Sequence, residues 1–189
     1  MAFYSEIELQ NIGFKKLGKN VKISNLSSIY NVSKISIGDN SRIDDFCILS
    51  GGEEGIEIGR YVHIACYCSL IGKKLIRMND FSGLSSRVSI YSSSDDYSGR
   101  SLTNPTVDSK YTRVKSSPVI LEKHVIIGAG SVILPGVTLG IGSAVGALSL
   151  VNKNCEAFGI YVGNPAVFLR NRNTNLLELE RRFENEENE

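Results

Sequence analysis

A six-residue repeat is the feature of this chain that most constrains its fold. Residues 121–156 divide into six consecutive hexads, LEKHVI, IGAGSV, ILPGVT, LGIGSA, VGALSL and VNKNCE. The first position of each hexad is aliphatic: Leu121, Ile127, Ile133, Leu139, Val145 and Val151. The fifth position is small or β-branched: Val125, Ser131, Val137, Ser143, Ser149 and Cys155. A period of six suits neither an α-helix nor a simply alternating strand, and it is typical of a parallel β-solenoid.

The physical meaning of this period is a triangular prism in which each face takes about six residues. The large aliphatic residue points inward at the middle of a face, and the fifth residue is small because it packs near a corner. Each coil hydrogen-bonds to the coils above and below it at a spacing of about 4.8 Å. Because six hexads make only two coils, which are not stable alone, we expect further coils upstream.

The same phase is found upstream, with one early slip and one weak position. Leu17, Ile23 and Ile29 follow the six-residue spacing, and the phase then slips by two residues at 35–37. The later inward series is expected to contain Ile37, Ile43, Leu49, Ile58, Ile64, Leu70, Ile76, Ser82 and Val88, with Ser82 as its weak member. The prediction is an all-β prism of about six coils over residues 17–163.

Three segments lack the repeat. Residues 1–16 are expected to form an N-terminal cap, with a short helix in IELQNIGF. Residues 92–118 are polar and read as one long excursion loop, and loops of that length are usually functional or disordered. Residues 164–189 form a C-terminal extension with a short helix at 174–184, whose Leu176, Leu179 and Phe183 share one face. The acidic tail, ENEENE, is expected to be frayed.

Composition excludes several classes of partner. The chain has 21 Lys and Arg residues against 20 Asp and Glu residues, for a net charge of +1. This balance, without a basic cluster, predicts no nucleic-acid partner and no anionic membrane surface. The chain lacks an apolar run approaching the ~18 residues of a membrane span and lacks a signal-peptide core, so we expect a cytoplasmic protein.

The four cysteines read as structural residues. Cys47, Cys68 and Cys155 fall at the small fifth position of a hexad, where a compact apolar residue is needed. Cys66 and Cys68 form a C-x-C pair, which leaves metal or redox chemistry as a weaker alternative. Proximity to an active site remains a second alternative for Cys66.

The run IIGAGSVILPGVTLGIGSAVGALSLVNKN, followed by IYVGNPAVFLR, resembles a known family. It is similar to the hexapeptide-repeat acyltransferases with a left-handed parallel β-helix. Within them it most resembles the sugar acetyltransferases of the galactoside, maltose and xenobiotic type and of surface-polysaccharide clusters. The resemblance implies a left-handed coil, acetyl-CoA as co-substrate, and a homotrimer with active sites between subunits. It also implies an acceptor that is a sugar, either a nucleotide-linked amino sugar or a galactoside-type glycan.

The resemblance also suggests where coenzyme A lies. Ala129 and Ala147 are expected to flank the pantetheine arm along the C-terminal coils. The Thr-Lys pair of the family stands here as Asn152-Lys153. Lys153 is therefore a candidate phosphate contact, as is Arg170, and the alternative for both is an ordinary solvated charge.

The catalytic base is less clear from the resemblance. Where the family has its usual histidine, at the exit into the loop, this chain reads Ser-Asp-Asp-Tyr at 94–97. A hydroxyl or amine acceptor must lose a proton as it attacks a thioester. His63, on an outward edge, is one candidate base, and Asp95 or Asp96 is a candidate base or amine-binding group. A His–Asp pair follows if His63 meets the loop. His124 is a weaker candidate whose alternative is a surface or interface histidine.

The loop also carries residues suited to a sugar. Tyr97 and Tyr111 can stack on sugar or base faces, and Asn104 can bind hydroxyl groups. The paired aspartates favour a cationic amino sugar, while O- and N-acetylation both remain open.

Two other functions compete with acyl transfer. A zinc hydratase of the γ-carbonic-anhydrase type uses three histidine ligands, whereas the chain has two histidines in all. We therefore expect no metal site. A non-enzymatic β-solenoid scaffold is the second alternative, and it would need no long tyrosine-containing loop.

Overall fold

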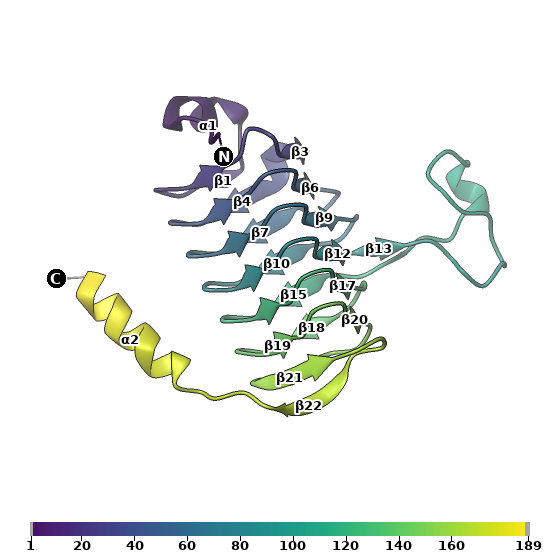
Figure 1. Ribbon diagram of the computed structural model, residues 1–189. Coiled ribbons are helices and arrows are strands. Elements are labelled where there is room, and N and C mark those ends of the chain that lie inside the picture. The colour runs from purple at the N-terminus through teal and green to yellow at the C-terminus, as the bar shows by residue number, and fades with distance from the viewer. Residues whose placement is uncertain (1, 188–189) are drawn as a thin grey trace.

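The protein is a parallel β-solenoid of about seven turns, one more than the repeat count predicts (Figure 1). The computed structural model describes residues 2–187. Three sheets run along the prism and form its faces. The loop projects from one side of the prism in Figure 1, and the C-terminal helix returns along the body on the other side. Within residues 2–187 there is no helix with the length and apolar character needed to cross a membrane.

The strands divide among the three faces in a regular order. The first face contains β1 (Lys16–Leu17), β4 (Ile35–Ile37), β7 (Ile56–Ile58), β10 (Ile76–Met78), β15 (Val119–Leu121) and β18 (Thr138–Leu139). The second contains β2 (Lys22–Ile23), β5 (Arg42–Ile43), β8 (His63–Ile64), β11 (Gly83–Leu84), β16 (Ile126–Ile127), β19 (Ala144–Val145), β21 (Gly159–Val162) and β22 (Val167–Asn171). The third contains β3 (Ser28–Tyr30), β6 (Ile48–Ser50), β9 (Ser69–Ile71), β12 (Ser89–Tyr91), β17 (Val132–Ile133) and β20 (Leu150–Val151). All neighbours pair in parallel except β21 and β22, which close the end of the second face as an antiparallel pair.

The hexads of residues 121–156 behave as predicted. Every first-position aliphatic residue is at most 4% exposed, and every fifth-position residue is equally buried. Equivalent residues stack from turn to turn, as Ile43, Ile64 and Leu84 do on the second face. The core is therefore a column of aliphatic side chains along the prism axis, whose burial is the main stabilising term. Cys47, Cys68 and Cys155 are buried in it as free thiols, as predicted.

The predicted phase is wrong after Ile76. Ser82 and Val88 were expected at mid-face, but Met78, Leu84 and Ile90 take those places. Ser82 and Val88 are buried at corners instead. The phase shifts because the upstream strands of the first face each bury two residues instead of one, as β10 does with Ile76 and Met78.

This doubled inward pair lengthens the upstream turns. Ile56 pairs with Ile76 in the next turn, a separation of twenty residues. Leu121 pairs with Leu139, a separation of eighteen residues. The slip of two residues recognised at 35–37 therefore recurs in the upstream turns and ends where the strict hexads begin.

Three stacked rings lie at the corner between the first and second faces, and we call them the ring column. Tyr61, Phe81 and His124 occupy successive turns with positive φ values of 55°, 59° and 63°. The ring centroids of Tyr61 and Phe81 lie 4.9 Å apart, and those of Phe81 and His124 lie 5.2 Å apart, both stacked. The left-handed backbone conformation turns each corner and aims each ring outward along the same line.

The N-terminal segment caps the first turn. Helix α1 (Glu6–Ile12) begins at Ser5, whose side chain forms a capping box with Glu8. Leu9 is buried from this helix into the end of the core. A short helix therefore lies within the segment where one was expected.

The excursion loop leaves and rejoins the prism through a short stem. β13 (Ser93–Ser94) pairs antiparallel with β14 (Lys115–Ser116), and between them lies one 3₁₀ turn, η2 (Ser109–Tyr111). A second 3₁₀ turn, η1 (Val32–Lys34), lies in the upstream coils. The prism resumes at Val119, close to the predicted loop end.

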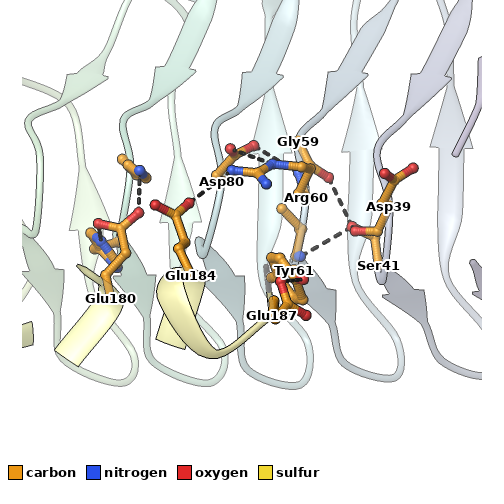
Figure 2. Close-up of polar contacts among 12 residues, drawn as sticks. Asp39, Ser41, Gly59, Arg60, Tyr61, Asp80, Glu180, Glu184 and Glu187 are labelled. Atoms are coloured by element: carbon orange, nitrogen blue, oxygen red, sulfur yellow. Dashed lines mark hydrogen bonds and ion pairs between the residues drawn. The ribbon is translucent and has the colours of Figure 1, made fainter. Parts of the chain in front are cut away.

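Carboxylates of helix α2 (Leu176–Glu187) hold it against the ring column through ion pairs and hydrogen bonds (Figure 2). Glu180 pairs with Lys123 and lies 2.8 Å from Nε2 of His124. Glu184 accepts a hydrogen bond from Arg60 at 3.0 Å. Between these carboxylates, Phe183 packs edge-on against the rings of Tyr61 and Phe81.

The expectation of a frayed acidic tail is wrong as far as Glu187. The helix continues to that residue, and its carboxylate accepts a hydrogen bond from the hydroxyl of Tyr61. Residues 188–189 lie outside the described residues. The acidic side chains hold the helix because basic and hydroxyl groups of the coils lie opposite them.

We expect Glu180→Gln to lower the free energy of unfolding at neutral pH by about 1–3 kcal/mol. Burial raises the pKa of Glu180, but hydrogen bonds from Lys123 and His124 outweigh burial and hold the pKa below its ordinary value of 4.5. A depressed pKa contributes stability above the ordinary value, and this is lost as the pH falls through the folded value. Urea unfolding of both proteins at neutral and acidic pH checks this.

The difference between wild type and variant should therefore shrink well below pH 4.5. Glu178→Gln is the matched control, because Glu178 is exposed on the same helix and pairs only with Arg182 in the described chain. Its effect should stay below about 0.5 kcal/mol. If Glu180→Gln lowered the free energy of unfolding equally at every pH, the contacts of Glu180 would not be ionic.

Candidate active site

A cleft of about 780 Å³ lies where the loop meets the third face. The end of β12 contributes Tyr91, and the loop contributes Asp95, Tyr97 and Asn104. Lys73 lies on the prism side of the cleft, 4.0 Å from Glu53. The cleft therefore combines a carboxylate, an amide, aromatic surface and one cation, which are the groups expected for a polyhydroxylated ligand.

Asp95 is the loop carboxylate that is available for chemistry. It is half-buried and lines both the main cleft and a smaller hollow of about 350 Å³ beside it. Its Oδ2 accepts a long hydrogen bond of 3.4 Å from the backbone N–H of Asn104. One weak contact leaves most of the acceptor capacity of this carboxylate for a ligand.

Asp96, the other predicted loop carboxylate, serves the loop itself. Its oxygens accept from the backbone N–H of Ser98 at 3.0 Å, from the Ser98 hydroxyl at 2.9 Å and from Ser101 at 3.0 Å. The Ser98 backbone bond, with these hydroxyls, lowers the pKa of Asp96, although burial opposes the shift. A carboxylate saturated in this way is a poor proton acceptor, so the structure disfavours Asp96 as the base.

The three predicted acceptor-binding residues are not equivalent in the structure. Tyr97 lines the cleft and is 92% exposed, and Asn104 lines it from a left-handed backbone conformation. Tyr111 is exposed and stands outside the cleft lining, with Lys110 over its ring at 4.9 Å. The cleft therefore brings together two of the three residues.

His63 faces a different carboxylate from the one expected. It lies on the outer side of β8, and its Nε2 is 2.9 Å from Oδ2 of Asp44. Asp44 also accepts from Arg42 at 2.6 Å. Burial raises the pKa of Asp44, but the hydrogen bonds from His63 and Arg42 outweigh burial and lower it.

The expectation that His63 and the loop aspartates share an edge is therefore wrong within one chain. Asp95 lines the cleft under the loop, whereas His63 lines a second cavity of about 530 Å³ on the second face. Asp44 precedes His63 by one turn of the prism, since Arg42 pairs with His63. The turn spacing, applied to Asp44, is the signal that could have found this pair.

His124 lines the same second cavity as His63. It is 9% exposed, contacts Glu180 and stacks on Phe81, so within this chain it is packed under α2 and is not the surface histidine given as its alternative. Across residues 2–187, no three His, Cys, Asp or Glu side chains gather closely enough to hold a metal ion. Each histidine instead contacts a single carboxylate, His63 that of Asp44 and His124 that of Glu180.

The predicted coenzyme A positions form part of an exposed line at the corner between the second and third faces. Ala129 and Ala147 lie on successive turns, and the carbonyl of Ala129 accepts from Leu148 N–H at 2.8 Å. The line continues to Ser86, whose carbonyl accepts from Gly130 N–H at 3.0 Å. Coils pack tightly here, since a Cβ on Gly128 would lie 2.4 Å from the nitrogen of Ala147.

The part of this line formed by Ser85 and Ser86 was not predicted from the sequence. Ser85 and Ser86 follow β11, and the thiol of Cys66 lies 3.4 Å from the hydroxyl of Ser86. Cys66 therefore lies at this same corner, one turn away from Ser86. The signal in the sequence is the recurrence of small residues at the same corner, which the phase error after Ile76 concealed.

The predicted phosphate contacts do not form one cluster. Asn152 and Lys153 follow β20 at the end of the third face and are exposed. Arg170 is exposed on β22, at the end of the second face, opposite Ile160. Each remains a candidate for a separate contact.

The fold of this chain is similar to that of solved solenoid structures. A hexapeptide-repeat-containing acetyltransferase from Vibrio cholerae superposes with a TM-score of 0.57 over 88% of this chain and 79% of that chain, at 23% identity. At that identity the likeness shows the fold alone, a β-solenoid built from hexapeptide repeats. No family model matches the chain.

Two stronger likenesses define the family. The dTDP-4-amino-4,6-dideoxy-D-glucose acyltransferase of Escherichia coli is 53% identical over 183 residues, or 97% of this chain and 95% of that protein. AntD, an N-acyltransferase from Bacillus cereus in complex with dTDP and 3-hydroxybutyryl-CoA, gives a TM-score of 0.96 and 49% identity over 100% of both chains. The chain therefore belongs to the sugar acyltransferases of the hexapeptide-repeat family. It is an enzyme, which rules out the scaffold alternative.

Other AntD structures carry a single substitution of one aspartate or of one serine. One of these complexes holds dTDP-4-amino-4,6-dideoxyglucose together with coenzyme A. In this chain, Asp95 lines the cleft under the loop and Ser85 lines the second cavity.

We expect Asp96→Asn to loosen the loop without unfolding the prism. The amide retains the shape of the side chain but replaces an acceptor oxygen with a donor group, which faces the hydroxyls of Ser98 and Ser101. Hydrogen exchange at residues 97–104 should speed up at least several-fold, while exchange in the coils stays unchanged. Mass-spectrometric exchange on the intact protein measures both.

Asp108→Asn is the control for this loop variant. Asp108 is exposed and its Oδ1 accepts only a local bond, from Lys110 N–H at 3.0 Å, within the described contacts. Its substitution should leave exchange at 97–104 unchanged. Equal protection in wild type and Asp96→Asn would show that Asp96 does not hold the loop.

Proposed function

We propose that this enzyme transfers an acyl group from acyl-CoA to the amino group of a nucleotide-linked amino sugar of the dTDP-4-amino-4,6-dideoxyglucose class. The observation that carries the proposal is the match over 100% of both chains with an N-acyltransferase that binds dTDP and an acyl-CoA. The curated relative at 53% identity, named for the same sugar, supports the same acceptor. An N-acyl product is favoured over an ester because both relatives act on an amino sugar or are named N-acyltransferases.

The cleft under the loop is the acceptor half of the proposed site. Tyr97 offers a ring face for the nucleotide or sugar, and Asn104 offers an amide for hydroxyl groups. Lys73 supplies a positive charge suited to a diphosphate. Tyr111, outside the cleft of this chain, is free to contact ligand or protein belonging to a neighbouring copy.

The proposed chemistry is direct attack on the thioester. The sugar nitrogen, in its neutral form, attacks the carbonyl carbon of the acyl group, and the carbon–sulfur bond breaks to release coenzyme A. A proton leaves the nitrogen and, in balance, one is gained by the departing thiolate. Asp95 is the group that pairs with the ammonium form and accepts its proton, because its oxygens are largely unoccupied.

The donor half is the line of small residues at the corner between the second and third faces. The pantetheine arm lies along Ala147 and Ala129, and the thioester lies near Ser85 and Ser86, farther along the same line. Exposed small side chains let the arm approach the backbone closely. Acetyl-CoA is the expected donor, and the AntD complex with 3-hydroxybutyryl-CoA supports acyl-CoA as the donor class.

Assembly into a homotrimer would join the two halves. The loop extends away from its own prism (Figure 1). Its side chains Tyr97, Leu102 and Tyr111 are exposed. Large apolar groups on an extended arm are stabilised by burial against another surface. A neighbouring copy offers its donor corner to this arm, so that Asp95 of one copy meets the Ser85 line of the next.

The substrates and the product indicate where the reaction occurs and how its product is used. We propose that the reaction occurs in the cytoplasm, where acyl-CoA and nucleotide sugars are both available. An N-acylated nucleotide sugar is an activated donor for a glycosyltransferase. Its use in surface-polysaccharide synthesis fits the sugar class of the relatives.

We expect Asp95→Asn to lower kcat for the amino sugar by about 10²-fold or more, because the amide cannot take the proton. The assay follows thiol release from acetyl-CoA with dTDP-4-amino-4,6-dideoxyglucose, and product mass identifies the amide. Asp108→Asn, in the same loop, should retain the wild-type rate. Full activity of the Asp95 variant would exclude Asp95 as the base, and absence of any wild-type transfer would exclude the proposed reaction.

We expect sedimentation equilibrium to give about three times the chain mass of 20.7 kDa. Replacing both Tyr97 and Leu102 with serine should shift the protein towards smaller species, since these side chains lose contact with the neighbouring copy. Circular dichroism should show an intact prism in that variant. A wild-type monomer with full activity at assay concentration would contradict a shared site.

A further inference from the structure

Helix α2 lies against the coils without becoming part of the core. None of its residues is buried, and Phe183, which packs on the ring column, is still 39% exposed. The ring centroid of Phe183 lies 5.2 Å from that of Tyr61 and 6.1 Å from that of Phe81. The ion pair of Glu184 with Arg60 is partly exposed, and such pairs contribute little to stability (Figure 2). A segment with so few buried apolar contacts opens locally before the whole protein unfolds.

A short segment joins this helix to the coils and is anchored at one end. Arg172 fixes the chain just after β22, because its guanidinium donates to backbone carbonyls of two successive coils at 2.9 Å and 3.0 Å. At residues 173–175 the described hydrogen bonds are local, such as the 2.8 Å bond from the N–H of Asn175 to the side chain of Asn173. These three residues can therefore act as a hinge, and we call residues 173–187 the strap.

The start of the strap forms one wall of the second cavity. Leu176, the first residue of α2, lines this cavity of about 530 Å³ together with Arg172. The rings of Tyr61, Phe81 and His124 line it as well. The same rings support α2, through Phe183 and through the carboxylate that contacts the imidazole. The position of the strap therefore determines how far the cavity is enclosed.

The other side of this cavity reaches the proposed donor corner. Ser85 and Ser86 line the cavity and belong to the line of small residues that continues to Ala129. Ser82 also lines it and is 2% exposed, and its hydroxyl has no hydrogen-bond partner within residues 2–187. A buried hydroxyl in this state is stabilised by a ligand or a water that hydrogen-bonds to it. A thioester held at the two serines would therefore share one cavity with the strap.

A ligand that contacts the strap and the coils together binds better when the strap is docked. Such a ligand stabilises docking, and docking strengthens its binding by the same factor. The helix of the strap has twelve residues, which are too few for a stable helix in water without packing. Undocking should therefore be seen as unfolding of α2 while the coils keep their structure.

We propose that residues 173–187 form a strap that closes the second cavity over the coenzyme A thioester and opens by undocking from the ring column. The proposal rests on the proposed acyl transfer, which places the donor at Ser85 and Ser86, and it adds a conformational step to that reaction. The strap is closed while the donor is bound, and it opens to admit the donor and to release coenzyme A.

Hydrogen exchange on the intact enzyme, with and without coenzyme A, tests this coupling. Without ligand, amides of residues 178–187 should exchange at least tenfold faster than those of the coils, because the strap opens on its own. Saturating coenzyme A should slow the exchange of these amides at least threefold. The proposal would be overturned if α2 exchanged as slowly as the coils. It would also be overturned if coenzyme A slowed exchange in the coils and left α2 unchanged.

Phe183→Ala should loosen the strap without weakening the helix itself, since alanine favours the helical conformation. Exchange in α2 should speed up at least fivefold, and the KM for acetyl-CoA should rise at least threefold while kcat changes less than twofold. Leu179→Ala is the matched control, because it shortens an apolar side chain of the same helix that is 55% exposed. A wild-type KM in a folded Phe183→Ala protein would overturn the proposal.

Glu184→Gln keeps the test decisive if Phe183→Ala fails to fold. It removes the negative charge that faces Arg60, whose guanidinium retains Asp80 as a partner at 3.1 Å. Exchange in α2 and the KM for acetyl-CoA should each rise at least twofold. Unchanged values of both in this variant would overturn the proposal.

The same measurements separate the strap from the proposed function. Slower exchange of α2 with coenzyme A, in an enzyme that transfers no acyl group to the amino sugar, would defeat the proposed function and leave the strap in place. Acyl transfer at a normal rate, with no effect of coenzyme A on α2, would defeat the strap and leave the proposed function in place.

Discussion

The hydrogen-bonded register between successive turns determines where every other feature of this protein lies. Each short strand pairs with its equivalents above and below, so a side chain in one turn stands directly over its counterpart in the next. The aliphatic column fills the interior by this rule, and the same rule builds lines of equivalent residues on the outside. The column of rings under α2 and the line of small residues at the corner between the second and third faces both follow from it. These two surface features of the coils therefore run along the prism axis.

The repeat made much of this architecture predictable. The hexads of residues 121–156, the N-terminal cap, the loop limits and the C-terminal helix all follow from periodicity and its interruptions. The number of turns and the phase after Ile76 do not, because the first face accepts a second inward residue in its upstream strands. A longer turn keeps the same core contacts, so hydrophobic periodicity alone does not distinguish a twenty-residue turn from an eighteen-residue one.

The site was predictable in its parts but not in its pairings. Asp95, Tyr97 and Asn104 were expected because a polar loop interrupts the repeat, and all three line one cleft. The roles of Asp96 and His63 depend on partners that only the folded chain specifies. Asp96 is saturated by serine donors a few residues away, and His63 is held by Asp44 from the preceding turn. The acidic end of α2 had the same ambiguity, because charge composition alone predicts a solvated tail whether or not cations lie opposite it.

The stem formed by β13 and β14 has an evolutionary consequence. It brings the two ends of the excursion together before either rejoins the prism, so the coils on both sides retain their register whatever lies between. Lengthening a loop whose ends are already joined adds little conformational entropy cost, since that cost grows only slowly with length. Loop and prism are therefore separable in evolution. Changes within this one contiguous segment can reshape the cleft under the loop, while the core of the solenoid remains as it is.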